Sequence, residues 1–319
     1  MNHATSPGHS PCVADAPVDI SVVIPAYHGA ATIAACLASV QRATEGRRAE
    51  IIVVDSSDDR CSEIVREQFP DVRLVLSSTR LSAGAARNRG VAIARGRIVF
   101  FVDQDCVVPH DWIAALEQHF ADPSTGGVGG SLGILNPECL TGCGVYFLEF
   151  FRHFPHDGPP QRNQNFLLGC NAAYRADALR DGAFPNQTLG EDVVLSHRMR
   201  QRGLGLVYDP RVEVLHRNRE GKKEFFRYNA KMGTASAEDQ LALRRSRSRL
   251  FLRFPILIFL TPAVVLPVVF VRLLRGSKSR TYLPTFLLLL PFCLAGNWVW
   301  AAAFRRQILA SRRRGSLSS

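Results

Sequence analysis

Two aspartates separated by one residue follow an apolar run near the middle of the chain. The run is IVFFV at residues 98–102, and Asp103 and Asp105 come next. Consecutive apolar residues of this kind are typical of a strand covered on both faces. Two carboxylates so close together repel each other unless a positive charge lies between them. The pattern therefore predicts either a polar loop that closes a strand or a divalent-metal site that holds a phosphate-bearing substrate.

A second pair of carboxylates, Glu191 and Asp192, lies in the segment LGEDVVLSHRMRQRG at residues 189–203. A helical pattern follows the pair, so we expect both side chains at a helix N-terminus. Carboxylates are common there because the helix dipole stabilises negative charge. A positioned carboxylate can also remove a proton from a hydroxyl group as a general base. The residues alone leave both roles open.

Strands that alternate with helices position the first pair of carboxylates. Strand-like runs are expected at residues 20–27, 49–55, 72–78 and 97–103, and helices at residues 30–43, 61–69 and 82–96. This alternation predicts an α/β fold with a Rossmann-like, mixed but mostly parallel sheet and helices on both faces. Ligands bind at the carboxyl ends of the strands in such sheets. Tyr27, Asp55 and the two aspartates all fall at those ends.

Several other kinds of site are excluded by the sequence. The first strand ends in PAYHGAAT, without the G-x-G-x-x-G or G-x-x-x-x-G-K-[ST] phosphate-binding pattern. The eight cysteines lack paired C-x-x-C spacing, so we expect neither structural zinc nor a disulfide framework. Of the 39 Lys and Arg residues, 14 lie after residue 240, which leaves 25 against 28 Asp and Glu in the rest of the chain. We therefore expect no nucleic-acid partner.

Four segments in order resemble family 2 glycosyltransferases, which have the GT-A fold. The segments are SVVIPAYHGAATIAACLASV, IIVVDSSDD, SAGAARNRGVAIARGRIVFFVDQD and LGEDVVLSHRMRQRG, and the likeness covers residues 20–217. The resemblance implies a nucleotide-sugar donor and Mg²⁺ or Mn²⁺ as cofactor. It also implies that one group of residues lines the donor site: Pro25, Ala26, Tyr27, Asp55, Gly84, Arg87, Asp103, Gly169, Cys170 and Asn171.

The same resemblance assigns the metal and the base. Asp103 and Asp105 would hold the metal, with Asp105 the firmer ligand and His216 a third. Asp192 would be the catalytic base, and Glu191 would hydrogen-bond to the acceptor or to the loop. From the residues alone, each position also has a structural interpretation: for example, Asp55 as a helix N-cap, Arg87 as the solvated partner of a carboxylate, and His216 as a polar residue at a strand end.

Two long uncharged stretches follow, at residues 254–271 and 282–304. A helix needs ~20 residues to cross the hydrocarbon layer. Arginine clusters flank both stretches, and no Asp or Glu occurs from residue 241 to the end. We therefore expect a C-terminal membrane helical hairpin with both ends in the cytoplasm. The internal prolines also allow segments that lie in the membrane interface, and a buried core hairpin is the third possibility.

These observations predict a flexible polar leader at residues 1–18, a GT-A catalytic domain at 19–240 and a basic membrane-associated segment at 241–319. We expect an inverting, metal-dependent glycosyltransferase of the hexosyltransferase type at the cytoplasmic face of the cell inner membrane. It would move a sugar from a UDP-linked donor to a lipid or lipid-linked glycan in cell-envelope or exopolysaccharide biosynthesis. The alternatives are a sugar-nucleotide nucleotidyltransferase, for which PAYHGAAT lacks the expected Arg and Lys, and a non-catalytic glycan-assembly scaffold, which would need no base.

Overall fold

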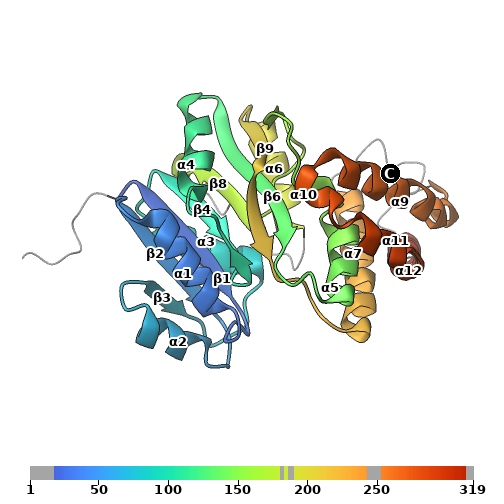
Figure 1. Cartoon of the computed structure of the whole chain (residues 1–319), viewed down its shortest axis with the longest axis horizontal. Helices are drawn as coiled ribbons and strands as arrows, with labels where there is room; N and C mark the ends of the chain where they lie inside the picture. Colours follow the sequence, from blue (N-terminus) through green and yellow to red (C-terminus); the bar gives the residue numbers. More distant parts are fainter. Residues whose placement is uncertain (1–17, 180–182, 186–189, 243–252, 314–319) are drawn as a thin grey trace, which may run out of the picture.

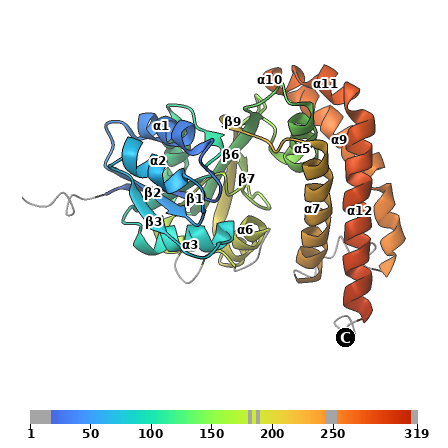
Figure 2. The same ribbon diagram turned by 90° about the horizontal axis from the view of Figure 1, so that it is seen from below.

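The computed structural model describes residues 18–179, 183–185, 190–242 and 253–313, and it has an α/β part beside a helical part (Figures 1 and 2). The first part contains, in chain order, β1 (Ile20–Ala26), α1 (Ile33–Thr44), β2 (Ala49–Asp55), α2 (Cys61–Gln68), β3 (Arg73–Leu76), α3 (Ala83–Ile93), β4 (Ile98–Val102), β5 (Cys106–Val107), α4 (Trp112–Glu117), β6 (Thr125–Ile134), α5 (Leu140–Glu149), β7 (Gln161–Arg162), β8 (Asn171–Arg175), α6 (Glu191–Gln201) and β9 (Gly205–His216). The helical part adds α7 (Lys222–Ala242), η6 (Pro255–Leu260), α9 (Pro262–Arg275), α10 (Ser277–Arg280), α11 (Leu283–Leu288) and α12 (Leu290–Arg313). Nearly all of the predicted leader lies outside the described residues.

One mixed sheet joins all these strands in the order β3-β2-β1-β4-β8-β6-β9-β5, with β7 also paired to β9. The first four strands pair in parallel, as the alternation of strands and helices predicts, and β8 then runs antiparallel to β4. Strand β5 pairs antiparallel with β9 so that Cys106 lies opposite His216. This register brings the loop after β4 next to the end of the last strand.

The sheet is covered on both faces, which explains its uninterrupted apolar strands. All five residues of β4 are buried. Helices α1, α2, α4 and α5 pack on one face, and α3 and α6 pack on the other. The larger core also contains Val269 and Leu273 of α9 and Phe286 of α11. The helical part therefore shares a hydrophobic core with the α/β part.

The second predicted hydrophobic helix needs correction. Residues 282–304 are split at Leu289 into α11 and α12, and α12 continues to Arg313. Among the described residues, only Pro255–Arg275 is long and apolar enough to cross a membrane. The reason is that α12 carries a buried amide, Asn297, and four arginines within its length, and packs one side against α7.

Candidate active site

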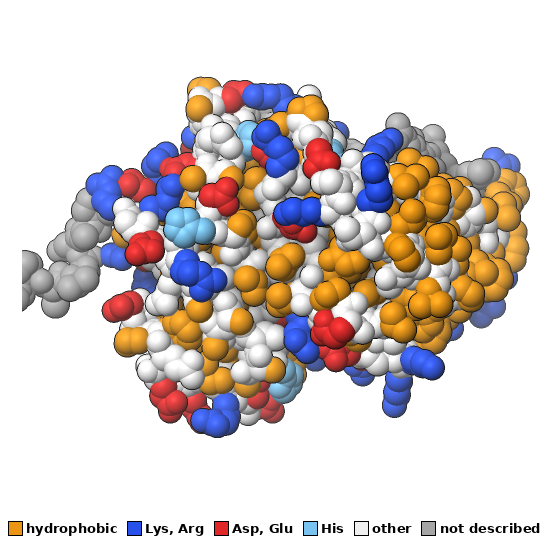
Figure 3. Space-filling model, viewed as in Figure 1, with side chains coloured by type: hydrophobic (Ala, Val, Ile, Leu, Met, Phe, Trp, Pro, Cys, Tyr) orange, Lys and Arg blue, Asp and Glu red, His pale blue; other side chains and the backbone are white. Residues whose placement is uncertain are grey.

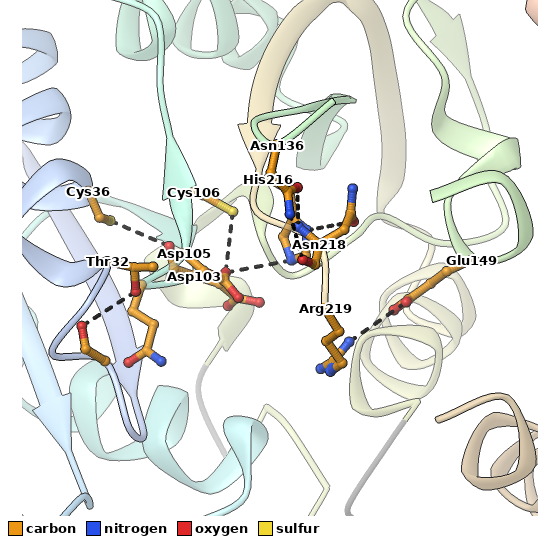
Figure 4. A network of polar contacts seen from close by, with 12 residues as sticks. Thr32, Cys36, Asp103, Asp105, Cys106, Asn136, Glu149, His216, Asn218 and Arg219 are labelled. Carbon is orange, nitrogen blue, oxygen red and sulfur yellow. Dashed lines mark hydrogen bonds and ion pairs between the residues drawn. The ribbon is translucent and has the colours of Figure 1, made fainter. Parts of the chain in front are cut away.

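The pairing of β5 with β9 builds a cluster of metal-ligand types. Ligand atoms of Asp105, Cys106 and His216 all lie within 4.8 Å of one another. His216 Nε2 is 3.5 Å from Asp105 Oδ1, and its Nδ1 is 3.0 Å from the side-chain oxygen of Asn218 (Figure 4). Because an amide oxygen only accepts, Nδ1 carries a proton toward Asn218, and Nε2 is the ring nitrogen that faces Asp105. This is the orientation that a metal-binding histidine requires.

Asn218 is itself held in place by a buried partner. Its backbone N–H donates to Asn136 Oδ1 at 2.9 Å, and Asn136 Nδ2 donates to the Asn218 carbonyl at 2.9 Å. Neither asparagine is predicted from the sequence as a site residue. A polar side chain two residues after a strand-ending histidine is the one local signal for Asn218.

The donor set of Asp105 and His216 fits a divalent cation. Two ligands ~2.1 Å from one ion lie about 3 Å apart when adjacent, close to the Asp105–His216 separation. Burial raises the pKa of the Asp105 carboxyl, and the charge of Asp103 adds to this while His216 opposes it; a bound cation would offset this unbalanced negative charge. Burial also raises the pKa of the Cys106 thiol well above its ordinary value, so the thiol stays protonated and is a poor ligand. Carboxylate oxygens suit Mg²⁺ and Mn²⁺ alike, and an imidazole nitrogen is a donor that transition metals accept.

Arg87 joins the two carboxylate pairs. Its Nη2 donates to Asp103 Oδ1 and its Nη1 donates to Glu191 Oε1, both at 2.7 Å. The Arg87 side chain is 3% exposed, so these are charge-assisted bonds inside the protein rather than a solvated surface pair. The start of α6 is thereby fixed to the loop after β4. Arg87 is expected beside the donor, and the structure places it as a bridge between the loop at residues 103–105 and the start of α6.

Asp192 lies at the start of α6, behind a glycine that the backbone requires. Gly190 has a φ of 76°, a left-handed conformation that favours glycine. Burial, and then the charge of Glu191, raises the pKa of the half-buried Asp192 carboxyl to about 7, while Arg87 and the Gly169 N–H lower it. A carboxylate that titrates near neutrality is suited to accept a proton.

Gln104, between the two aspartates, ties their loop to the end of β1. Its Oε1 accepts from the Tyr27 N–H at 2.9 Å, and its Nε2 donates to the Tyr27 carbonyl at 2.8 Å. The Arg80 guanidinium lies over the Tyr27 ring at 4.3 Å. Pro25 and Ala26 precede Tyr27 and are buried in β1. Gln104 and Arg80 are both absent from the sequence prediction, since neither type is distinctive in a loop.

Asp55, at the end of β2, is not a helix cap. Helix α2 begins at Cys61, and the backbone N–H of Cys61 donates to Asp59 Oδ1. Asp55 Oδ1 accepts from the Ser57 N–H at 2.9 Å, while its buried Oδ2 has no hydrogen-bond partner among the described residues. Burial, and then the charge of Asp55, raises the pKa of the neighbouring Cys61 thiol, so this carboxylate is enclosed by protein groups at the end of β2.

The remaining residues expected at the donor site are two glycines, Gly84 and Gly169, and the neighbouring pair Cys170 and Asn171. A Cβ at Gly169 would lie 2.7 Å from Arg87 Cζ, and one at Gly84 would lie 3.1 Å from a backbone carbonyl, so close protein packing already requires both glycines. Cys170 is buried. The expectation for Asn171 needs correction, because its side chain is fully buried and bonded to Trp112 Nε1 and to the carbonyls of Ser131 and Val212.

Arg219, a cationic group that the sequence interpretation does not include, interacts electrostatically with Asp105. The Arg219 guanidinium lies 3.9 Å from the centre of the Tyr228 ring, and Tyr228 donates to Glu149 Oε1 at 2.6 Å (Figure 4 shows Arg219 and Glu149). Arg219 also lowers the pKa of Asp105. This arginine can therefore offset negative charge near the cluster.

The sequence pattern described as "Glycosyl transferase family 2" matches residues 21–182, half of the chain. The chain belongs to glycosyl transferase family 2. This family 2 glycosyltransferase is similar to "Glycosyltransferase AglE" of Haloferax volcanii, with 28% identity over 236 residues that cover 71% of this chain and 77% of that protein. It is also similar to the "Pre-mycofactocin glycosyltransferase" of Mycobacterium tuberculosis, with 26% identity over 231 residues that cover 69% of this chain. The match spans 47% of that relative's length.

A solved structure shares the fold of this glycosyltransferase. It is the mannosyltransferase PcManGT from Pyrobaculum calidifontis in complex with GDP-Man and Mn²⁺, with a TM-score of 0.59 and 22% identity. The superposition covers 92% of this chain and 90% of that one. The likeness confirms the GT-A fold expected from the sequence.

Proposed function

We propose that this glycosyltransferase is metal-dependent and inverting, and that it moves a sugar from a UDP-linked donor to a lipid or lipid-linked glycan. The observation that carries the proposal is the Arg87 bridge between Asp103 and Glu191. It holds a metal-binding loop and a candidate base on neighbouring elements of one site. A binding scaffold would need neither this buried ion pair nor a carboxylate with a pKa near neutrality beside it.

Asp192 is the proposed base. The acceptor hydroxyl oxygen attacks the anomeric carbon from the face opposite the nucleotide, and its proton passes to the Asp192 carboxylate. The bond from the anomeric carbon to the diphosphate oxygen breaks, and the nucleoside diphosphate leaves with that electron pair. Glu191, held by Arg87, is assigned as a positioning residue that keeps the start of α6 in place.

The donor end of the site is assigned to the strand ends. Asp55, at the end of β2, contacts the base or ribose, and Tyr27, held by Gln104, lines the same pocket. Asp103, Asp105 and His216 are the residues that would hold Mn²⁺ or Mg²⁺. When bound, the cation neutralises charge that develops on the leaving diphosphate. PcManGT, with the same fold, holds GDP-Man and Mn²⁺, which supports a nucleotide sugar and this metal.

The acceptor and location are proposed from the helical part. Strand β9, which ends at His216, leads within six residues into α7, and α7 packs on α12. The catalytic centre therefore lies beside the part of the chain that carries the longest apolar segment. A lipid or lipid-linked glycan at the cytoplasmic face of the inner membrane fits this arrangement, as in envelope or exopolysaccharide assembly.

The test is release of nucleoside diphosphate by detergent-purified protein from a panel of UDP-, GDP- and dTDP-sugars, with and without Mn²⁺. We expect metal-dependent release from one donor, and loss of release in Asp105→Ala and Asp192→Asn. The proposal would be overturned if nucleoside-diphosphate release were the same with and without Mn²⁺ and were unchanged in Asp192→Asn. Asp177→Asn is a matched control, because Asp177 is an aspartate outside the site and should leave release unchanged.

A further inference from the structure

The longest apolar segment, Pro255–Arg275, has one face against the protein and one face exposed. The exposed face is a stripe at helical spacing formed by Ile256, Leu260, Val264, Val271 and Leu274, of which the first three are 60%, 62% and 64% exposed. Figure 3 shows hydrophobic side chains gathered over this helical part. An exposed apolar patch of this kind marks a membrane or protein contact.

The segment is fixed to the α/β part at its C-terminal end. Val269 and Leu273 belong to the main core, and Arg272 Nη1 donates to the carbonyl of Arg152 at 2.9 Å. Directly after the segment, Lys278 pairs with Glu213 of β9 at 2.8 Å. These contacts leave no free helix end that could emerge on the far side of a bilayer.

The N-terminal end is fixed to α12, and α12 is fixed to α7 along its length. Ile258 packs in one cluster with Ala237 of α7 and with residues of α12. The α7–α12 contacts include Phe225 stacked on Phe292, with ring centroids 4.0 Å apart, and Gln307 Nε2 donating to Glu238 Oε1 at 2.9 Å. Figure 2 shows the two helices side by side.

Helix α7 cannot follow the segment into hydrocarbon, because it carries charge along its length, including Lys231 near its middle. The charged residues include Lys222, Lys223, Glu224, Arg227, Lys231 and Glu238. Charged side chains at the centre of a bilayer are rare because they are strongly unfavourable there. A segment locked to α12 and α7 therefore cannot cross a membrane without carrying these charges with it.

We propose that Pro255–Arg275 lies flat in one leaflet of an anionic bilayer instead of crossing it. This inference rests on the proposed membrane attachment of the enzyme. Charge complementarity identifies the anionic surface. A groove between η6 and α12 has an apolar floor that includes Phe259 and Leu309, and three arginines line it: Arg305, Arg306 and Arg313. Guanidinium groups next to apolar side chains suit the boundary between lipid phosphates and acyl chains.

The decisive experiment measures depth at single cysteines in full-length protein on vesicles of phosphatidylglycerol and phosphatidylcholine. Ile256→Cys, Val264→Cys and Val271→Cys are made in a Cys12→Ser/Cys139→Ser background, labelled with a fluorophore and quenched by lipids that carry spin labels at known depths. The other cysteines are buried. A flat segment places all three labels at a similar depth, about 5–10 Å into the headgroup and acyl boundary.

A crossing segment gives a different depth pattern. Ile256 and Val271 are 15 residues apart, which is ~22 Å along a helix axis, so their labels would lie near opposite surfaces with Val264 at the bilayer centre. That result would overturn the inference. Glu67→Cys on α2, at the other end of the molecule, is the unquenched control. Absence of quenching at all four positions would also overturn it, while nucleotide release in detergent would still test glycosyl transfer independently.

The anionic preference has its own test in vesicle sedimentation. Arg305→Gln/Arg306→Gln should weaken binding to phosphatidylglycerol vesicles about 30-fold, since each basic side chain contributes about one kcal/mol near an anionic surface. Arg42→Gln/Arg66→Gln, on exposed positions of α1 and α2, is the matched control and should bind as the parent does. The proposal would be contradicted if the two double variants bound phosphatidylglycerol vesicles equally well. It would also be contradicted if the parent bound pure phosphatidylcholine vesicles as strongly as phosphatidylglycerol vesicles.

Discussion

Replacement of Arg87 by methionine tests the bridge on which the site depends. The change removes two charge-assisted hydrogen bonds of 2.7 Å. The Glu191 side chain is only 11% exposed, and an unpaired buried charge destabilises a protein by about 3–5 kcal/mol. The Asp103 side chain is 31% exposed and can rehydrate, so it adds little. We expect Arg87→Met to lower the free energy of unfolding by about 3 kcal/mol, and the thermal midpoint by about 6–12 °C.

The double variant Arg87→Met/Glu191→Met distinguishes the destabilisation caused by an unpaired Glu191 charge from that caused by loss of the Arg87 side chain itself. With both partners apolar, no unpaired charge remains at this contact, so we expect it to be about 2 kcal/mol more stable than Arg87→Met. Thermal unfolding in detergent measures stability, and nucleoside-diphosphate release measures activity. Recovered stability without recovered turnover is the expected result, because Asp103 and the base helix are no longer held together.

Two results would refute this reasoning. The first is a double variant that is less stable than Arg87→Met, so that the two substitutions lower the free energy of unfolding additively. The second is an equal loss in the surface control Arg47→Met, whose pair with Glu117 is more exposed and should contribute less than about 1 kcal/mol.

Three further predictions concern the base, the metal and the donor. Because the raised pKa of about 7 keeps Asp192 protonated at lower pH, kcat/KM should fall about tenfold per pH unit below 7; a profile that stays flat to pH 5 would argue against this base. Asn218→Ala removes the acceptor for His216 Nδ1 and should weaken Mn²⁺ binding about 10–100-fold by calorimetry, whereas unchanged affinity would remove His216 from the proposed ligand set. Gln104→Ala leaves the Tyr27 backbone unpaired and should raise the donor KM about tenfold in release assays with little effect on kcat; an unchanged KM would contradict its positioning role.

Much of the α/β part is predictable from the sequence because its signals are local. The buried run at residues 98–102 and the alternation around it locate the strands, and strand ends locate Tyr27, Asp55 and Asp103. The partners that fix these residues are not predictable in the same way. The β5–β9 register brings Asp105 to His216, and a contact between such distant positions leaves no trace in local periodicity.

The errors in the sequence interpretation have physical causes. The family resemblance places Asn171 in the donor wall, yet its side chain satisfies three groups inside the sheet. Hydropathy also predicts a single hydrophobic helix over residues 282–304, which the structure divides into α11 and α12. It cannot distinguish apolar residues that face lipid from those that face α7, and Phe304 of α12 faces inward. Tertiary packing decides both cases.

Calorimetric titration of a nucleotide-sugar donor, with and without Mn²⁺, tests the central claim most directly because it needs no acceptor. The account predicts metal-dependent binding of the same strength in the parent and in Asp192→Asn, since the base does not bind the donor. It predicts loss of the metal-dependent part in Asp105→Ala. Donor binding that is unchanged in Asp105→Ala, or abolished in Asp192→Asn, would contradict the division of this site into a metal-binding half and a base.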